Sequence, residues 1–366
     1  VGDGSEAQAV AGVGPGGRSG RAPHDEAPQV VSLGGLTPGG LAQRVRALEL
    51  DVLLLNPERS RHYRAVRPNL LRSAYGTEQY RQKLRSFRGH GERALRELWR
   101  RNPWLQRQQR WERNFYEDRS TGPLVVAQSA YMRREILDSY GVDPSQVKVV
   151  HNAVDLQCFN AEARTARRAA GVRETLAVPA DSFCLLFIGH NYRLKGLWQV
   201  LQQVADARAA GAPIHLLVAG RGTGSGQRRH AERLMRQLGL EAHVTRVGSV
   251  TNPLDLYAAT DGLMHLSWHD SFGFVVLEAM ACGVPVITTP WAGASELIES
   301  GRTGFVADPG DTAAVAQALA ELVAPGLAAP MGQRAAAAVR RCDEPNNFAR
   351  IEALMQRAAH VPVEFR

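Results

Sequence analysis

Lysine, cysteine and long apolar runs are all scarce in this chain of 366 residues. The cysteines lie far apart and form no CxxC pair and no Cys/His group with zinc spacing, which excludes a zinc finger and a dithiol redox motif. We expect buried free thiols in a reducing compartment at Cys158, Cys184, Cys282 and Cys342. No apolar stretch approaches the roughly 20 residues of a membrane-spanning helix, and no secretory signal is visible.

Lysine occurs only at positions 83, 148 and 195, although lysine and arginine together number 44. Where arginine has taken almost every basic position, a remaining lysine can mark a site that needs a compact charge rather than a planar guanidinium. Chance explains its survival equally well. The scarcity therefore draws attention to Lys195 without assigning it a function.

The net charge of +8 favours anionic partners such as nucleotides, phosphorylated lipids or nucleic acid. The length allows two domains of ordinary size. Residues 1–28 are rich in glycine, alanine and charge, and we expect a disordered or damaged N-terminus there. Their glycine-rich segment Val13–Gly17 lacks the Lys-Ser/Thr pair of a Walker phosphate loop.

Short apolar runs alternate with amphipathic runs along most of the chain. This pattern predicts an α/β fold whose parallel sheet is covered by helices on both faces. A polar, Arg/Ala-rich stretch over 161–179 is interpreted as the boundary between two domains. The predicted strands are 29–33, 51–55, 124–127, 147–150, 183–188, 214–219, 244–247, 262–267, 286–289 and 305–307. The predicted helices are 39–50, 129–140, 196–209, 227–238, 253–259, 274–282, 295–299, 312–323, 330–342 and 347–359.

Residues 58–119 combine many arginines with interleaved aromatic residues, and helical spacing runs from about 78 to 116 with a break near Pro103. A solvated helical face with Arg–Glu pairs is one interpretation. An anionic membrane or phosphorylated lipid is a second, because basic residues with Trp and Tyr suit an interface. Nucleic acid is a third, but no recognised binding module is present and we expect no nucleic-acid partner.

Two carboxylates eight positions apart, Asp270 and Glu278, lie between two predicted strands. The first follows the strand 262–267, and the second is about two turns into the next helix. Open α/β sheets bind ligands at this carboxyl edge. Asp270 could instead only cap the helix, and Glu278 could be a surface glutamate.

Other loops should open on the same edge. Arg193 and Lys195 come just before a predicted helix, where two cations and the helix N-terminus can hold a diphosphate, although they could also be exposed loop charges. Glycine-rich turns let the backbone approach a base or phosphate. The predicted nucleotide-binding positions are Gly189, Gly220, Arg221, Gly248, the helix-start amides of Ser271, Phe272 and Gly273, and Glu278. Two acids and two cations suit a nucleotide-sugar, and without an Asp-x-Asp pair we expect no metal site.

Several of these motifs resemble the retaining family 4 glycosyltransferases, which have the GT-B fold of two facing Rossmann-like domains. The likeness covers about 124–359 and is strongest over 262–310, with LEAMACGVPVITT and GRTGFVADPGD. The segment GHNYRLKG (189–196) looks closest to lipopolysaccharide-core glucosyltransferases. The family's Glu-x7-Glu signature falls on Asp270 and Glu278, so the first acid is one methylene shorter here.

The resemblance implies hexose transfer with retention from a UDP-glucose-like donor to a lipopolysaccharide-core or other glycan or lipid-linked acceptor. It implies catalytic roles for Arg193, Lys195 and Asp270, a ribose contact for Glu278, and no cofactor or metal. Implied domains are an acceptor domain over 29–160, incomplete by comparison with the family, a donor domain over 165–345, and a helix over 346–366 that crosses back. An N-domain histidine near the sugar cannot be assigned among His24, His62 and His90. We expect a cytoplasmic protein, peripheral on the inner face of the plasma membrane.

Two rival functions stay open. One is a sugar-nucleotide epimerase or hydrolase on the same fold. The other is a non-catalytic nucleotide-binding protein whose N-terminal domain has degenerated. Free UDP released without acceptor would favour the former, and nucleotide binding without any transfer would favour the latter.

Overall fold

The computed structural model describes residues 8–11, 29–32, 52–55, 66–67, 70–73, 101–103, 106–107, 116, 124–250, 252–358 and 364–365. The chain divides into two compact units, one reaching Val150 and resuming at Phe348, and the other spanning His151–Asn347. The sequence placed this boundary after 160, about ten residues too late. The structure also builds two helices into the stretch interpreted as a boundary, α6 (Ala161–Ala169) and α7 (Val172–Thr175). Arginines from both helices bond Asp261, which explains why a polar segment is helical here.

The second unit is built on a six-stranded sheet in the order β10-β9-β8-β11-β12-β13, and every pairing is parallel. Its strands are β8 (Phe183–Ile188), β9 (Ile214–Ala219), β10 (Val244–Gly248), β11 (Gly262–His265), β12 (Val286–Thr288) and β13 (Gly304–Val306). The central strands are apolar throughout because both of their faces are covered. The predicted strands agree with these bounds to within two residues.

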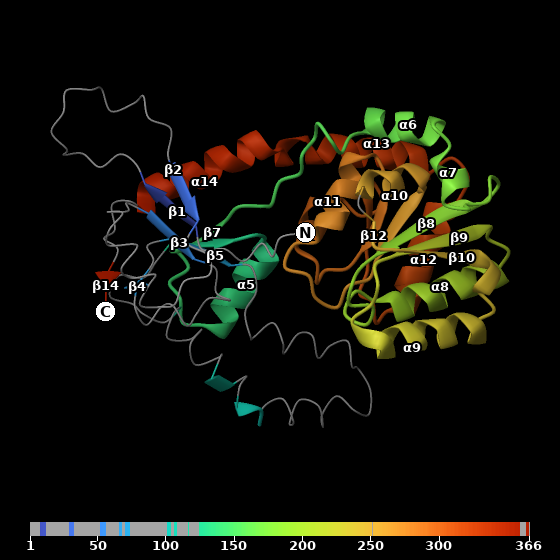
Figure 1. Ribbon diagram of the computed structural model, residues 1–366, viewed down its shortest axis with the longest axis horizontal. Helices are drawn as coiled ribbons and strands as arrows, with labels where there is room; N and C mark the ends of the chain where they lie inside the picture. The colour runs from blue at the N-terminus through green and yellow to red at the C-terminus, as the bar shows by residue number, and fades with distance from the viewer. Residues whose placement is uncertain are drawn as a thin grey trace. The chain divides into compact units, whose positions relative to one another are not determined.

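Helices cover both faces of this sheet, as Figure 1 shows. One face packs under α8 (Leu197–Ala209), α9 (Gly224–Gln237) and α12 (Thr312–Val323). The other packs under α10 (Pro253–Ala259), α11 (Phe274–Ala281) and α13 (Ala328–Val339). The chain changes face after β10, and β11 then returns to the other side of β8. This reversal is the position at which open α/β sheets form a crevice at the carboxyl ends of their strands.

The first unit has a mixed sheet in the order β2-β1-β3-β5-β6-β7. Strands β3 (Val52–Leu55), β5 (Leu70–Ser73), β6 (Leu124–Ala127) and β7 (Val147–Val149) are parallel. Strand β1 (Gln8–Ala11) runs antiparallel between β2 (Gln29–Ser32) and β3. Strand β1 lies within residues 1–28, where the sequence predicts a disordered or damaged N-terminus, and β5 was not predicted. A separate antiparallel pair joins β4 (Val66–Arg67) to β14 (Glu364–Phe365).

Two helices belong with the described part of this unit. Helix α5 (Ala130–Ser139) begins where the Ser129 hydroxyl accepts the Met132 N–H at 3.0 Å. The last helix, α14 (Glu344–Ala358), lays Leu354 and Ala358 against Val126 and Val150. Its residues from Phe348 onward belong to this unit.

Several predictions lie wholly or largely outside the described residues: the helices over 39–50 and 78–116, the arginine-rich surface and the three N-domain histidine candidates. Among the described helices, no single one has the length and apolar composition of a membrane span. Only α12 with the stretch Ala328–Cys342 meets that criterion jointly, across a bend of 103°. All four cysteines are free, but Cys158 is exposed, which corrects the expectation that all are buried.

Candidate active site

The loop that follows β8 is fastened to the chain that follows β11. The Leu194 carbonyl accepts the Trp268 N–H at 2.9 Å. Gly196 takes a φ of +79° and lies so close to this segment that a Cβ would come within 2.1 Å of the Leu266 oxygen. Only glycine fits there, because the conformation is left-handed and the space is filled. This close approach places Lys195 beside the loop that carries Asp270.

Lys195, Asp270 and His265 form one buried cluster. The Lys195 ammonium and the His265 imidazole both bond the same oxygen, Oδ2 of Asp270, and the histidine distance is 3.1 Å. Side-chain exposure is only 22% for the lysine and 11% for the aspartate, so this ion pair is largely withdrawn from water. Burial alone would raise the pKa of Asp270, but Lys195 and then His265 outweigh it and hold that pKa far below its usual range. Asp270 is therefore an anion at every physiological pH.

Glu278 has a different environment. It lies on α11, eight positions after Asp270, and its Oε2 accepts a hydrogen bond from the Tyr257 hydroxyl at 2.6 Å. Burial raises the pKa of Glu278, and the tyrosine hydrogen bond offsets this only in part. The pKa of the fully buried Tyr257 is raised by burial and by the glutamate. Glu278 is therefore a half-buried, oriented acid and not the surface glutamate that the sequence left open.

The segment between the two acids is fixed by backbone hydrogen bonds to the chain after β12. The Asp270 N–H bonds the Trp291 carbonyl at 2.8 Å, and the Ala294 N–H bonds the Phe272 carbonyl at 2.6 Å. Helix α11 begins after Gly273, which has a φ of +93° and supplies no side-chain cap. Asp270 is thus not a helix cap, and Ser271 and Phe272 are buried against this support.

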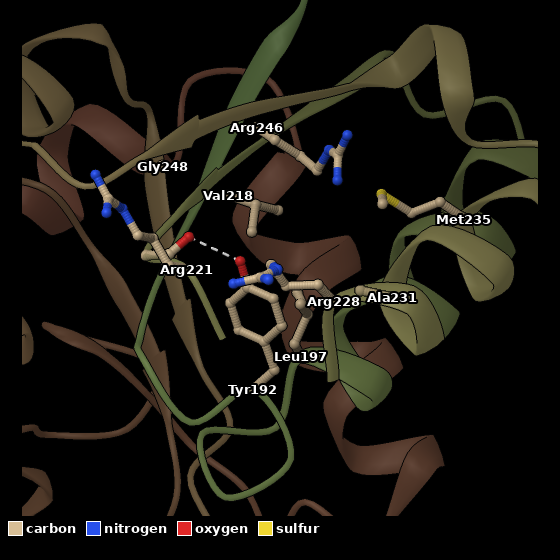
Figure 2. A pocket seen from close by; sticks show the side chains of 10 residues that line it. Tyr192, Leu197, Val218, Arg221, Arg228, Ala231, Met235, Arg246 and Gly248 are labelled. Carbon is tan, nitrogen blue, oxygen red and sulfur yellow. Dashed lines mark hydrogen bonds between the residues drawn. The ribbon is translucent and has the colours of Figure 1, made fainter. Parts of the chain in front are cut away.

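The two glycine-rich turns meet the first loop and form one side of a pocket. The Gly220 N–H bonds the Gly248 carbonyl at 2.6 Å, and a Cβ on Gly220 would come within 2.2 Å of the Gly189 oxygen. The Tyr192 hydroxyl donates to the Gly220 carbonyl at 2.7 Å, shown as the dashed line in Figure 2. A cavity of about 480 Å³ opens beside these turns, with arginines around an apolar floor. Its lining comprises Tyr192, Leu197, Val218, Gly220, Arg221, Arg228, Ala231, Met235, Arg246 and Gly248.

The structure therefore brings most of the predicted site residues to one sheet edge. Lys195 and Asp270, which are 75 positions apart, touch each other, and the turns at Gly189, Gly220 and Gly248 adjoin. Arg193 is half-buried in the same loop as Lys195. The described residues contain no group of three or more His, Cys, Asp or Glu side chains that could hold a metal ion.

Three functional candidates escaped the sequence analysis: His265, Tyr257 and Glu296. Glu296 Oε2 lies 3.0 Å from Nε2 of His151, whose carbonyl accepts the Asn347 side chain. In the sequence, His265 is marked only by its position as the last residue of the apolar strand Gly-Leu-Met-His. A buried histidine in that position is ordinarily a core residue, so the strand pattern alone could not single it out.

Comparison with known proteins agrees with this geometry. The family Glycosyl transferases group 1 matches residues 182–324, and Glycosyltransferase Family 4 matches residues 85–157. The second unit carries a glycosyltransferase domain. The region matched by the first family contains the Lys195–Asp270 pair, Glu278 and the three glycine turns, and the two matches together support a family 4-type glycosyltransferase.

Among curated relatives, D-inositol 3-phosphate glycosyltransferase 2 of Catenulispora acidiphila is 34% identical over 222 residues, which are 58% of this chain and 50% of the relative. The D-inositol 3-phosphate glycosyltransferase of Mycolicibacterium paratuberculosis is 36% identical over 210 residues, which are 56% of this chain and 46% of the relative. The chain thus spans about half the length of the curated relatives it matches. Neither name supports the narrower likeness to lipopolysaccharide-core enzymes.

Solved structures share the fold. Sucrose-phosphate synthase from Thermosynechococcus elongatus superposes with a TM-score of 0.70 at 18% identity, covering 89% of this chain and 78% of that one. A glycosyltransferase involved in lipopolysaccharide biosynthesis superposes with a TM-score of 0.64 at 16% sequence identity, covering 88% of this chain and 80% of that one. An Anabaena protein in complex with UDP and glucose superposes with a TM-score of 0.61 at 21% sequence identity, covering 86% of this chain and 81% of that one. These likenesses confirm the GT-B fold class.

Proposed function

We propose that the protein transfers a hexose from a UDP-sugar to an acceptor hydroxyl with retention of configuration. The observation that carries this proposal is the Lys195–Asp270 pair, held at the carboxyl edge of a glycosyltransferase domain beside Glu278. In the reaction the bond between the sugar C1 and the diphosphate oxygen breaks, and a bond from C1 to the acceptor oxygen forms. The diphosphate leaves with the bonding electrons, and its departing oxygen takes the proton that the acceptor hydroxyl loses on the same face of the sugar.

The site residues divide these tasks. Lys195 and Arg193 stabilise the negative charge that grows on the departing diphosphate, which is the step where fixed positive charge lowers the barrier most. Glu278 accepts hydrogen bonds from the ribose hydroxyls and is already oriented by Tyr257. Asp270 accepts from a hydroxyl of the donor sugar. Lys195 is shared, because it neutralises Asp270 in the free protein and turns toward the diphosphate when donor binds.

The identities of the donor and of the acceptor rest on different support. The fold neighbour that was crystallised with UDP and glucose supports a UDP-type donor. For the acceptor, the curated relatives' names favour an inositol phosphate, while the sequence motifs favour a lipopolysaccharide core or another lipid-linked glycan. A lipid-linked acceptor would place the protein on the inner face of the plasma membrane. No metal or organic cofactor takes part in the proposed step.

The test is a donor and acceptor screen on the purified full chain. UDP-glucose, UDP-N-acetylglucosamine and GDP-mannose are each incubated with D-inositol 3-phosphate or with lipopolysaccharide-core acceptors, and products are identified by mass spectrometry. A large loss of transfer in Lys195→Ala and a weaker apparent affinity for the donor in Glu278→Gln support the proposal. Turnover unchanged from wild type in both variants would overturn the site, and UDP release without a glycosylated product would indicate a hydrolase instead.

A further inference from the structure

His265 is the last residue of β11, and its side chain is directed to the loop that carries Asp270. Its neighbours in the strand, Leu263 and Met264, pack into the cores on opposite faces of the sheet. Strand alternation puts His265 on the same face as Leu263, which is the face that α11 covers. Its side chain is 1% exposed, and its Nε2 lies 3.1 Å from Oδ2 of Asp270. An imidazole buried this completely is held in one orientation by packing.

The surroundings of this imidazole also determine its protonation. Asp270 is an anion, so the nitrogen facing it, Nε2, carries the proton and donates. The other nitrogen, Nδ1, has no hydrogen-bond partner among the described residues. A proton on Nδ1 would be a buried donor without an acceptor, which is costly. Burial also lowers the pKa of His265, which favours the neutral ring with its proton on Nε2.

We propose that His265 is a positioning residue for the sugar-binding acid, and that its Nε2–H fixes the Asp270 carboxylate so that Oδ1 faces the donor sugar. This inference rests on the proposed function. Both interactions of the carboxylate fall on Oδ2, and Oδ1 receives no hydrogen bond from any described residue. Oδ1 is therefore the oxygen available to a sugar hydroxyl.

The histidine matters because Lys195 cannot hold the carboxylate alone. Lys195 is proposed to turn toward the diphosphate when donor binds, and its flexible stem allows that movement. Asp270 would then lose one of its two anchors at the moment its geometry is needed. His265, rigid and on a strand, keeps the carboxylate in place throughout the reaction. Small displacements of a positioned group cost large factors in rate.

The experiment compares His265→Leu and His265→Asn with a matched control, His215→Leu. His215 is also a buried strand histidine of the same sheet, and it bonds Thr245 at 2.9 Å instead of an acid. Isothermal titration with UDP and with UDP-glucose gives the ratio of the two affinities for each variant. This ratio isolates the sugar contact, because UDP lacks the hexose, and it needs no acceptor.

The proposal predicts that His265→Leu weakens UDP-glucose binding about 10-fold while UDP binding changes less than about 2-fold. His265→Asn, which retains an N–H donor, recovers part of the loss. His215→Leu lowers stability without changing the ratio. Equal weakening of both ligands in His265→Leu, as a merely structural histidine would give, overturns the proposal.

A second measurement separates this inference from the proposed transfer activity. With ¹⁵N-labelled histidine, the signal lost in His265→Asn should show a neutral Nε2–H tautomer at pH 7, and it should shift in Asp270→Asn. A charged or Nδ1–H ring at pH 7 would overturn the positioning role even if transfer is observed. Conversely, the predicted tautomer and affinity ratio without any transfer would reject the catalytic proposal alone.

Discussion

The two acids of the site differ in almost everything except their carboxyl groups. Asp270 is an anion paired with Lys195 and hydrogen-bonded by His265, and its pKa is far below the usual range. Glu278 has a neutral partner, Tyr257, and a pKa raised by burial. The difference follows from position. Asp270 lies in a loop that the cation-bearing loop reaches, whereas Glu278 lies on a helix packed against α10.

This contrast indicates that the first acid is poised by charge and the second by orientation. Two carboxylates whose pKa values are pushed apart by their surroundings commonly have separate tasks. Changing one acid or its partner should therefore alter one task and leave the other acid as an internal reference.

Replacing Lys195 by alanine should have the largest effect. It removes positive charge from the departing diphosphate and leaves Asp270 as an uncompensated buried anion. We expect kcat to fall about 100- to 1,000-fold, as measured by transfer at saturating UDP-sugar. Lys148→Ala, a lysine of β7, is the matched control and should retain full rate. A Lys195→Ala enzyme within twofold of wild type would contradict the role given to this lysine.

Opposite effects on stability are the next expectation. A depressed pKa means that Asp270 stabilises the fold above the unfolded-state pKa and loses this contribution only as pH falls through the folded-state pKa. Asp270→Asn should therefore lower the free energy of unfolding at pH 7 by about 2 kcal/mol. The raised pKa of Glu278 has the reverse sign, because its ionisation costs stability as pH rises. Thermal melts at pH 7 should thus show Glu278→Gln at or above the wild-type Tm, and an equal loss in both variants would refute the contrast.

Nucleotide affinity should depend on Glu278 more modestly. Glu278→Gln keeps the shape of the side chain but weakens hydrogen bonds from ribose hydroxyls to a charged acceptor. We expect Kd for UDP to rise about 10-fold. Titration with 2′,3′-dideoxy-UDP provides the control, since a ligand without these hydroxyls should bind both proteins alike. If Glu278→Gln weakened UDP and the dideoxy ligand by the same factor, Glu278 would contact another part of the nucleotide.

The smallest effect belongs to Tyr257→Phe. The lost hydroxyl no longer lowers the pKa of Glu278, so that pKa should rise further above its usual value. As the pH is lowered from 8 to 5, the affinity for UDP should begin to fall at a higher pH in the variant than in wild type, because Glu278 is protonated earlier. The affinity near pH 8 should change less than about 3-fold. An unchanged pH profile would show that the tyrosine does not tune this acid.

Much of the second unit could be predicted from sequence because its signals are local. Buried parallel strands such as Phe183–Ile188 are continuous apolar runs, and Pro253 and Asp311 mark helix starts. The failures arise from long-range contacts. Helices α6 and α7 look like a polar linker until Arg168 and Arg173 are seen to bond Asp261, about 90 positions away. Strand β1 needs partners on both sides to be a strand at all.

The candidate site shows the same limit. Loop position identified Arg193, Lys195 and Asp270 as candidates, and spacing identified Glu278, which lies eight positions after Asp270 on the next helix. The contact between Lys195 and Asp270 could not be predicted, because it depends on Gly196 meeting the backbone at Leu266. His265 and Tyr257 were missed for a related reason. The sequence around each of them is typical of a buried core residue. Their hydrogen bonds to Asp270 and Glu278 depend on the three-dimensional fold.

The most direct test of the divided site is a comparison of UDP and UDP-glucose binding to wild type, Asp270→Asn and Glu278→Gln by calorimetry. We predict that Glu278→Gln weakens both ligands by the same factor, since both contain the ribose. Asp270→Asn should weaken UDP-glucose only and leave UDP binding equal or tighter, because Lys195 is released from its partner. Equal weakening of both ligands by Asp270→Asn would contradict the assignment of this acid to the sugar.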